Sequence, residues 1–309
     1  MLSTNAASPV IFGCSGPTLT LEERGFFEKN QPLGFILFQR NIENKIQLKA
    51  LIKDLKSTVS HSNVPILIDQ EGGRVVRLKS PEWFEPPSSA ALAEGDLETA
   101  KKKVYECYAR MAQDLVEVGI TVDCAPVLDL RVKGADPIMG DRTFSSDPEI
   151  VAELGKVAIQ ALLEGSITPI MKHIPGHGAA TRDSHEELPV ISLSLNQLLP
   201  HFEPFKANRH CPAAMTAHII YTAIDRFNTA TQSSIIIEEV IRREIGFHGF
   251  LISDDLGMKA LSGPFSLRAH TSLKAGCDAV LHCSGKMDEM IDVMKGVAPF
   301  SIILKDKAG

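Results

Sequence analysis

Short apolar runs recur along the chain, and most of them follow an amphipathic stretch that closes at a glycine. Glycine followed by an apolar run occurs at 33–38, 118–122, 164–167, 245–252 and 275–281. Three further apolar runs lie at 9–12, 65–68 and 213–216. A glycine that ends a helix before a short buried strand is typical of repeated βα units in a parallel sheet. The pattern therefore predicts eight such strands.

Eight βα units within 309 residues favour a closed (β/α)8 barrel of the TIM type over an open doubly wound sheet. The open sheet is also disfavoured because no G-x-G-x-x-G motif follows an early strand. No sequence repeat, low-complexity tract or domain boundary interrupts the pattern. We therefore expect an α/β fold, a TIM-type barrel, with a single catalytic domain over residues 1–309.

The ends of two helices are marked in the sequence. An Asp-Pro pair opens, and a glycine closes, a helix predicted over 147–165. A second helix is predicted to begin at Ser233 or Ser234 and to end at Gly246. The interval 77–97 is rich in Pro and Ser and has no clear period, so it is interpreted as a long loop.

Polar and ionisable residues follow nearly every predicted strand. They are Gln39, Arg40, Asn41, Asp69, Gln70, Glu71, Asp129, Lys172, His173, His218, Asp254, Asp255 and His282, with Arg77 and Arg142 in nearby loops. Catalytic groups of a barrel collect at the C-terminal ends of its strands, so this coincidence predicts an active site at one rim. Cations, histidines and carboxylates without a cysteine nucleophile suit a polyhydroxylated substrate held by many hydrogen bonds.

The segment 168–188 carries the densest chemistry. An apolar strand ends at Lys172 and His173, a Pro- and Gly-rich turn follows, and Asp183 and His185 come just beyond it. Two cations, three histidines and a carboxylate within fourteen residues are poorly suited to packing. They indicate a strand end that opens into an active-site loop. The simpler alternative for Asp183 and His185 is a turn held by an Asx or Ser hydrogen bond.

Composition narrows the class of partner and the compartment. A net charge of −6 and a pI near 5.9 provide no basic surface for nucleic acid or an anionic membrane. The six cysteines show no C-x-x-C pair and no metal-ligand spacing, which favours buried, reduced thiols. Neither a signal peptide nor a stretch of roughly 18 apolar residues is evident. We expect a cytoplasmic monomer that binds a small molecule.

Four motifs in a fixed order resemble a known enzyme family. They are D-Q-E-G-G-R-V-V-R-L at 69–78, K-H-I-P-G-H-G at 172–178, D-S-H at 183–185 and S-D-D-L-G-M at 253–258. In this combination the chain resembles glycoside hydrolase family 3, in particular its single-domain bacterial β-N-acetylglucosaminidases. The resemblance extends from about residue 8 to residue 285.

The resemblance implies a role for each motif. Asp254 matches the nucleophile of a retaining mechanism, and His185, polarised by Asp183, matches the acid/base. The positions that match N-acetylglucosamine-binding residues are Asp69, Arg77, Arg142, Lys172 and His173. The implied reaction needs no cofactor and no metal. Its implied substrate is a muropeptide in which N-acetylglucosamine is linked β-1,4 to 1,6-anhydro-N-acetylmuramic acid, released during recycling of the bacterial cell wall.

Physical chemistry fits these implied roles. A cation such as Lys172, Arg77 or Arg142 beside Asp254 is expected to lower its pKa and keep the nucleophile ionised. An imidazole with a pKa near 6.5 can donate and then accept a proton at neutral pH. We further expect His185, on a glycine-flanked loop, to reach the site only when substrate binds.

Several alternatives stay open from the residues alone. The sequence does not distinguish Asp254 from Asp255 as nucleophile, and only the resemblance selects Asp254. The two aspartates could instead cap a helix before Leu256, and Arg77 and Arg142 could be surface ion-pair partners.

Three other functions compete with glycoside hydrolysis. A metal-dependent barrel hydrolase could use an Asp with His173, His177, His185, His218 and His282, although no H-x-H follows the first strand. A sugar-binding protein could use the same rim without cleaving its ligand. A phosphorylase could use phosphate in place of water, because a histidine acid/base does not repel phosphate as a carboxylate does.

Overall fold

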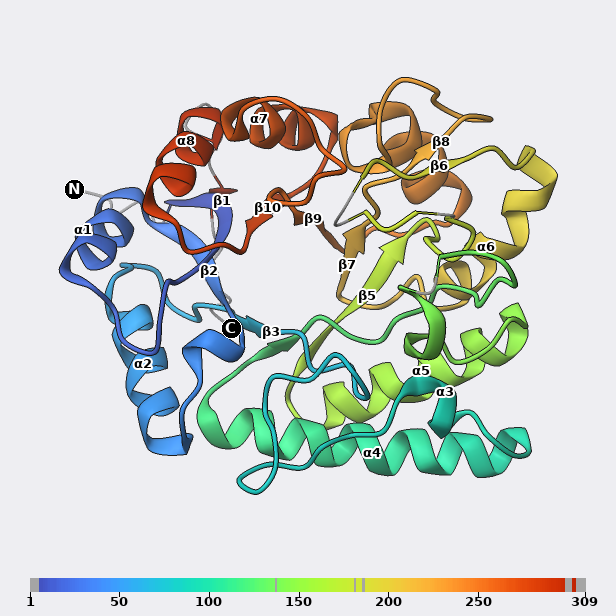
Figure 1. Cartoon of the computed structure of the whole chain (residues 1–309), viewed down its shortest axis with the longest axis horizontal. Coiled ribbons are helices and arrows are strands. Elements are labelled where there is room, and N and C mark those ends of the chain that lie inside the picture. The colour runs from blue at the N-terminus through green and yellow to red at the C-terminus, as the bar shows by residue number, and fades with distance from the viewer. Residues whose placement is uncertain (1–5, 137, 181, 185–186, 298–301, 304–309) are drawn as a thin grey trace.

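The computed structural model describes residues 6–297 apart from 137, 181, 185 and 186, together with Ile302 and Ile303 (Figure 1). Its barrel strands are β1 (Ala6–Gly13), β2 (Pro32–Leu37), β3 (Ile66–Ile68), β4 (Val122–Asp123), β5 (Thr168–Ile174), β7 (Ala213–Thr216), β9 (Phe250–Asp255) and β10 (Ala279–His282). Neighbouring strands are parallel throughout, and β10 pairs with β1 through Val10 and Val280, so the sheet closes. The predicted eight-stranded (β/α)8 barrel is confirmed.

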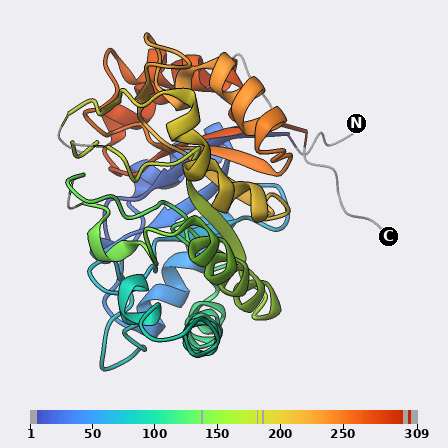
Figure 2. The same ribbon diagram turned by 90° about the vertical axis from the view of Figure 1, so that its right-hand side faces the viewer.

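An outer layer of helices surrounds the sheet. It contains α1 (Leu21–Asn30), α2 (Lys45–Ser57), α4 (Leu97–Val118), α5 (Pro148–Glu164), α6 (Leu195–Ala207), η4 (Ile236–Glu244), α7 (Phe265–Ala275) and α8 (Met287–Val297). In the side view α5 and α6 lie next to each other on the outside of the barrel, where they pack together (Figure 2). No helix among the described residues is long and apolar enough to cross a lipid bilayer.

Both predicted helices are present, with one difference in type. Asp147 caps α5 by accepting a hydrogen bond from the Glu149 N–H, and Gly165 ends the helix as expected. The helix after Ser233 is wound as a π-helix over η4, and the Ser233 hydroxyl accepts from the Ile236 N–H at 3.1 Å.

The prediction that a glycine ends the helix before a strand is wrong at one of its five positions. Gly34 lies inside β2, and Gln31, with φ of 47°, ends α1 instead. A Cβ on Gly34 would lie 2.6 Å from the Pro65 carbonyl oxygen, so the glycine permits close approach of the chain before β3. At Gly119, which ends α4 with φ of 92°, the prediction is confirmed.

The remaining elements are short and lie mainly in the loops. They are η1 (Gln39–Asn41), α3 (Ser89–Leu92), η2 (Gly140–Arg142), β6 (Val190–Ile191), β8 (Ile220–Tyr221), η3 (Ala230–Gln232) and β11 (Ile302–Ile303). The interval 77–97 is a loop apart from α3 and the first residue of α4, as expected. Strand β11 pairs antiparallel with the start of β1, and β6 pairs with β8.

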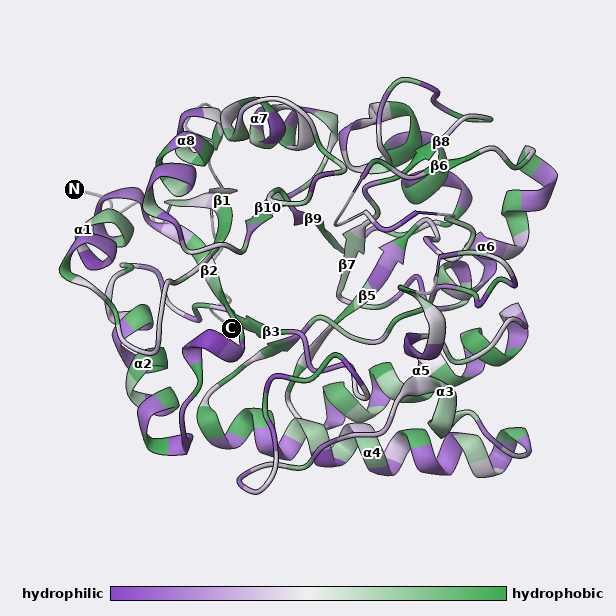
Figure 3. Cartoon of the chain, in the orientation of Figure 1, coloured by the Kyte–Doolittle hydropathy of each residue, from purple (hydrophilic) through white to green (hydrophobic). Residues whose placement is uncertain are grey.

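Two apolar cores lie on opposite faces of the sheet. The larger core fills the space between strands and helices and includes Leu251, whereas the smaller core lies on the inner face of the barrel and includes Ile170 and Ile252. Neighbouring residues 251 and 252 belong to different cores because successive side chains of a strand face opposite ways. The strands are largely hydrophobic, but a hydrophilic stretch lies within β5 and another at the end of β9 (Figure 3).

Candidate active site

A cavity of about 480 Å³ opens at the C-terminal ends of the strands. Its ionisable lining consists of Arg40, Asp69, Glu71, Arg77, Arg142, Lys172, His173, Asp254 and Asp255. The structure thus brings together all five residues expected to bind sugar and the expected nucleophile. Asp183 lies in the described part of the loop after β5, and His185 lies outside the described residues.

The loop after β3 is folded back so that Arg77 returns to Asp69. The buried Gln70 side chain accepts from the N–H groups of Arg77 (2.8 Å) and Leu78 (3.1 Å). Gly72, with φ of 104°, allows the turn, and a Cβ there would lie 2.2 Å from the Pro87 carbonyl oxygen. The Arg77 Nη2 consequently lies 3.4 Å from Asp69 Oδ2.

A buried network of charges connects the sugar-binding candidates. Lys172 Nζ lies 2.8 Å from Asp69 Oδ1 and 2.6 Å from Glu71 Oε1. Arg142 donates to the same Glu71 carboxylate through Nε at 2.7 Å and Nη2 at 2.8 Å, a bidentate geometry. Arg142 is 9% exposed, so its interpretation as a surface ion-pair partner is wrong.

Glu71 lines the cavity and pairs with two expected sugar-binding residues, but it was not among the residues assigned to the site from sequence. Burial opposes ionisation of its carboxyl, but the charges and hydrogen bonds of Arg142 and Lys172 outweigh burial and hold its pKa well below the ordinary range. Reciprocally, burial disfavours the Lys172 cation, but Asp69 and Glu71 raise its pKa above the ordinary value. The ionised side chains are therefore held in fixed positions before substrate enters. The sequence could have pointed to Glu71 by its position, two residues after the strand-end Asp69.

Asp254 and Asp255 differ in the contacts of their side chains. Both line the cavity, but Asp254 Oδ2 lies 4.0 Å from His173 Nε2, and its Oδ1 accepts from the Asp255 N–H at 2.7 Å. The Asp255 Oδ1 instead accepts from the N–H groups of Gly257 (2.9 Å) and Cys283 (3.0 Å). Burial, with a smaller contribution from the neighbouring carboxylate, raises the pKa of Asp255.

No helix starts directly after these two aspartates. The next described helix, α7, begins at Phe265, so the proposed N-cap pair before Leu256 is wrong. The geometry therefore gives the two aspartates different surroundings. Both line the cavity, but Asp254 lies beside a histidine, whereas the Asp255 side chain holds the backbone that follows β9 and β10.

The loop after β5 is anchored at its start. The Tyr221 hydroxyl donates to the Gly176 carbonyl at 2.8 Å, and a Cβ on Gly178 would lie 1.9 Å from the Leu130 carbonyl oxygen. His177 is buried, and its Nε2 lies 3.3 Å from Ser184 Oγ. Burial, reinforced by the nearby His173, lowers the pKa of His177 to about 4. The expectation that His185 moves with substrate concerns a position outside the described residues.

The histidines proposed as metal ligands have other surroundings. His218 lies 2.7 Å from Thr231 Oγ1 and 3.0 Å from the Asp255 carbonyl oxygen, and His282 lies 3.0 Å from Ser284 Oγ. Within the described ranges, no three His, Cys, Asp or Glu side chains come together as a group that could hold a metal ion.

Comparison with known proteins identifies close similarities. The chain matches the family model described as the glycosyl hydrolase family 3 N-terminal domain over residues 18–302. It is 38% identical to the β-hexosaminidase of Alkalilimnicola ehrlichii, over 89% of this chain and 80% of that protein. It is 36% identical to the β-hexosaminidase of Shewanella frigidimarina, over 90% and 82% of the two chains.

A solved structure matches over a similar length. NagZ from Neisseria gonorrhoeae, in complex with N-trifluoroacetyl-D-glucosamine, aligns with a TM-score of 0.86 and 32% sequence identity. The alignment covers 98% of this chain and 87% of that chain.

Proposed function

The chain belongs to glycosyl hydrolase family 3 and is a β-hexosaminidase of that family, and on this basis we propose that it is a retaining exo-β-N-acetylglucosaminidase. Its proposed substrate is a muropeptide in which N-acetylglucosamine is linked β-1,4 to 1,6-anhydro-N-acetylmuramic acid. The reaction would serve recycling of cell-wall fragments in the cytoplasm. The muropeptide and the compartment rest on the family resemblance of the sequence motifs.

The observation that carries the proposal is the position of Asp254. Its carboxylate faces a cavity lined by fixed charges, with His173 Nε2 4.0 Å away. A nucleophile needs both access to the substrate and an environment that tolerates its negative charge. The Asp255 Oδ1 instead accepts two backbone N–H groups, and burial raises the pKa of Asp255, which disfavours the ionised form that a nucleophile needs.

The network of ion pairs supports recognition of one sugar unit. Asp69, Arg77, Arg142, Lys172 and His173 would hold the hydroxyls and the acetamido group of N-acetylglucosamine. Because Glu71 already fixes Arg142 and Lys172, the sugar meets hydrogen-bonding groups that need little reorganisation. The related NagZ structure, which contains N-trifluoroacetyl-D-glucosamine, agrees with a sugar of this class.

The proposed reaction proceeds in two displacements. The Asp254 carboxylate attacks the anomeric carbon while His185, oriented by Asp183, gives a proton to the departing oxygen. A covalent glycosyl-aspartate and the free leaving sugar result. In the second step His185 takes a proton from water, the water oxygen attacks the anomeric carbon, and Asp254 is released. Two inversions leave the product with the configuration of the substrate.

Hydrolysis of 4-nitrophenyl β-N-acetylglucosaminide, with EDTA present, tests the proposal. We expect activity in the wild type and a loss of about 10³-fold or more in Asp254→Ala, as for other enzymes that lose their nucleophile. His185→Ala should lose less with this good leaving group and more with the disaccharide, whose departing alkoxide needs a proton. Asp54→Ala, an exposed aspartate on α2, is the control with unchanged activity.

The competing functions give different results in the same assay. Absence of cleavage would favour a sugar-binding protein, and loss of activity with EDTA would favour a metal-dependent hydrolase. A rate that requires phosphate and yields a sugar 1-phosphate would assign a phosphorylase. An α-configured first product, observed by proton NMR, would contradict the covalent Asp254 intermediate.

A further inference from the structure

One carboxylate next to the cavity is buried and takes no part in the proposed two displacements. Asp129 lies on the segment after β4, which runs parallel to β5. There the Leu128 N–H donates to the Lys172 carbonyl at 2.8 Å. Its side chain is fully buried. It therefore lies next to the place where β5 changes from strand to loop.

Both oxygens of Asp129 accept hydrogen bonds from the chain at this point. Oδ2 accepts from His173 Nδ1 at 2.7 Å and from the His173 backbone N–H at 3.1 Å. Oδ1 accepts from the His177 backbone N–H at 2.5 Å. One side chain thus spans the end of β5 and the first turn of the loop that follows.

We propose that Asp129 is a positioning residue that fixes His173 against Asp254 and, with its second oxygen, fixes the start of the loop that carries Asp183. The inference rests on the proposed glycosidase function and deepens it. Asp129 does not line the cavity, so it acts through the residues that it holds.

The first contact sets the orientation of the His173 ring. Because Nδ1 donates to Asp129, the opposite nitrogen, Nε2, faces Asp254 Oδ2 at 4.0 Å. A histidine without this partner could flip or rotate, and Asp254 would lose a polar neighbour held in a fixed position. The carboxylate and imidazole therefore form an orienting pair like those of other enzymes, in which a buried Asp fixes the tautomer of a histidine.

The second contact sets the course of the loop. Fixing the His177 N–H holds the Gly176–Gly178 turn, and the buried His177 ring lies 3.3 Å from Ser184 Oγ, next to Asp183 in sequence. A change at Asp129 should therefore affect leaving-group protonation as well as the surroundings of the nucleophile.

The charge on Asp129 suits both contacts. Burial opposes its ionisation, but the charge and hydrogen bond of His173, with a further contribution from His177, lower its pKa. Asparagine has nearly the same shape but only one acceptor oxygen. It cannot accept from the three N–H groups, and its own NH₂ would face one of them.

The experiment compares Asp129→Asn with Asp123→Asn. Asp123 is also fully buried, on β4. Its Oδ1 accepts the Gln70 N–H at 3.0 Å, and its Oδ2 has no hydrogen-bond partner among the residues that the structure describes. Burial raises the pKa of Asp123 well above its ordinary value, so an uncharged amide is a close replacement there. Both variants and the wild type are compared by thermal unfolding. Their kcat and KM are measured for 4-nitrophenyl β-N-acetylglucosaminide and for the disaccharide of N-acetylglucosamine and 1,6-anhydro-N-acetylmuramic acid.

A positioning role gives losses that depend on the leaving group. We expect Asp129→Asn to lower kcat/KM about 100-fold for the disaccharide and about tenfold for the nitrophenyl glycoside, the scale of a misplaced catalytic group. Most of each loss should be in kcat. Asp123→Asn should stay within about twofold of wild type for both substrates.

Other outcomes would overturn the inference. If kcat/KM of Asp129→Asn falls equally for both substrates and in proportion to the fraction of folded protein, Asp129 acts on stability alone. If kcat/KM is unchanged, Asp129 has no role in catalysis. If the wild type cleaves neither substrate, the proposed glycosidase function is wrong. That outcome differs from failure of the Asp129 inference alone, in which the wild type is active and Asp129→Asn is unaffected.

A spectroscopic test needs no folded Asp129 variant. In the wild type labelled with ¹⁵N-histidine, the His173 Nδ1–H should give a far-downfield proton resonance typical of a hydrogen bond to a buried carboxylate. His173→Gln, which leaves Asp129 intact, identifies that resonance by its disappearance. If no such resonance exists at low temperature, the Asp129–His173 pair is not formed and the inference is wrong.

Discussion

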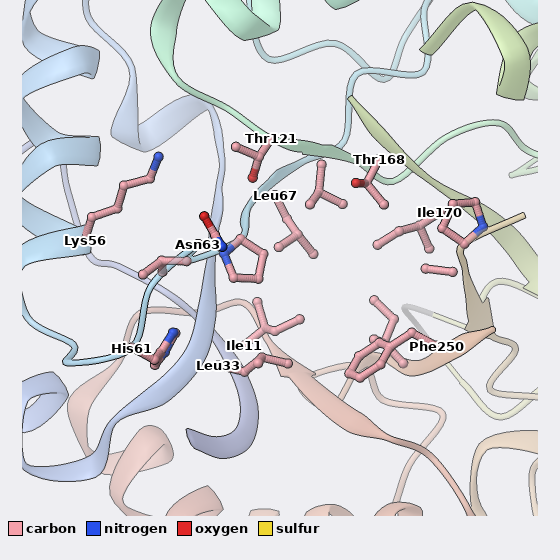
Figure 4. Close-up of a pocket in the computed structure, with 16 residues that line it drawn as sticks. Ile11, Leu33, Lys56, His61, Asn63, Leu67, Thr121, Thr168, Ile170 and Phe250 are labelled. Carbon is pink, nitrogen blue, oxygen red and sulfur yellow. The ribbon is translucent and has the colours of Figure 1, made fainter. Parts of the chain in front are cut away.

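The two ends of the barrel contain cavities of opposite character. The cavity at the N-terminal ends of the strands is the larger, about 790 Å³ against 480 Å³, and its walls are formed largely by aliphatic side chains such as Ile11, Leu67, Ile170 and Ile252 (Figure 4). Lys56, His61 and Asn63 contribute polar atoms to its lining. The smaller cavity contains the paired charges. Size therefore does not indicate where the chemistry lies.

The same strands form the walls of both cavities. On β5 the inward side chain is Ile170 in the first cavity and Lys172 in the second, and on β9 Ile252 is followed by Asp254. One step of two residues along a strand thus changes the lining from aliphatic to ionisable. The hydrogen-bonded strands hold the charged groups in place, and the loops beyond them shape the opening.

The largest expected difference between the two ends comes from a matched pair of lysines. Lys172→Met removes a buried cation and leaves Asp69 and Glu71 with less compensation, which should cost about 3–5 kcal/mol of unfolding free energy. The kcat/KM should also fall about 100-fold, because Asp69 and Arg142 lose their fixed geometry. Urea unfolding and steady-state kinetics measure the two effects.

Lys56→Met is the control at the other end. Lys56 lines the apolar cavity, and its Nζ makes a long contact of 3.4 Å with the Gly119 carbonyl. We expect unchanged kcat/KM and little change in the urea midpoint. Similar losses in both lysine variants would mean that the two ends do not differ as the cavities suggest.

A smaller effect should separate stability from activity along a single strand. Ile170→Ala removes buried aliphatic surface two residues before Lys172 and should cost about 2–4 kcal/mol of unfolding free energy. At a temperature where the variant is folded, kcat/KM should stay within about twofold of wild type. A drop comparable to that of Lys172→Met would show that the packing at the N-terminal end controls the site.

The smallest expected effect concerns pH. Folded His177 has a pKa lowered to about 4, whereas in the unfolded chain the ring takes up a proton below about 6.5. Protons therefore bind preferentially to the unfolded chain, and stability falls as pH decreases from 6.5 toward 4, by about 1.4 kcal/mol per pH unit for this residue. His177→Gln should reduce that slope between pH 6.5 and 5 in urea unfolding. An identical slope in both proteins would contradict the assignment.

The sequence by itself determined the class of fold and most of the site's members. Apolar runs of strand length, punctuated by glycines such as Gly119 and Gly165, predicted eight βα units, because local periodicity and helix ends depend on neighbouring residues. The rule that strand ends meet at one rim then placed Asp69, Lys172 and Asp254 together. The structure agrees, since all three line one cavity.

Only the tertiary structure decided the details that depend on contacts between distant segments. Asp254 and Asp255 are equivalent in a linear pattern, and their contacts in the folded chain distinguish them: His173 lies beside Asp254, whereas the Cys283 N–H donates to Asp255. Glu71 and Asp129 gain their significance from partners 71 and 44 residues away. A buried carboxylate is stable only where such partners compensate its lost hydration, and the chain has to fold before they meet.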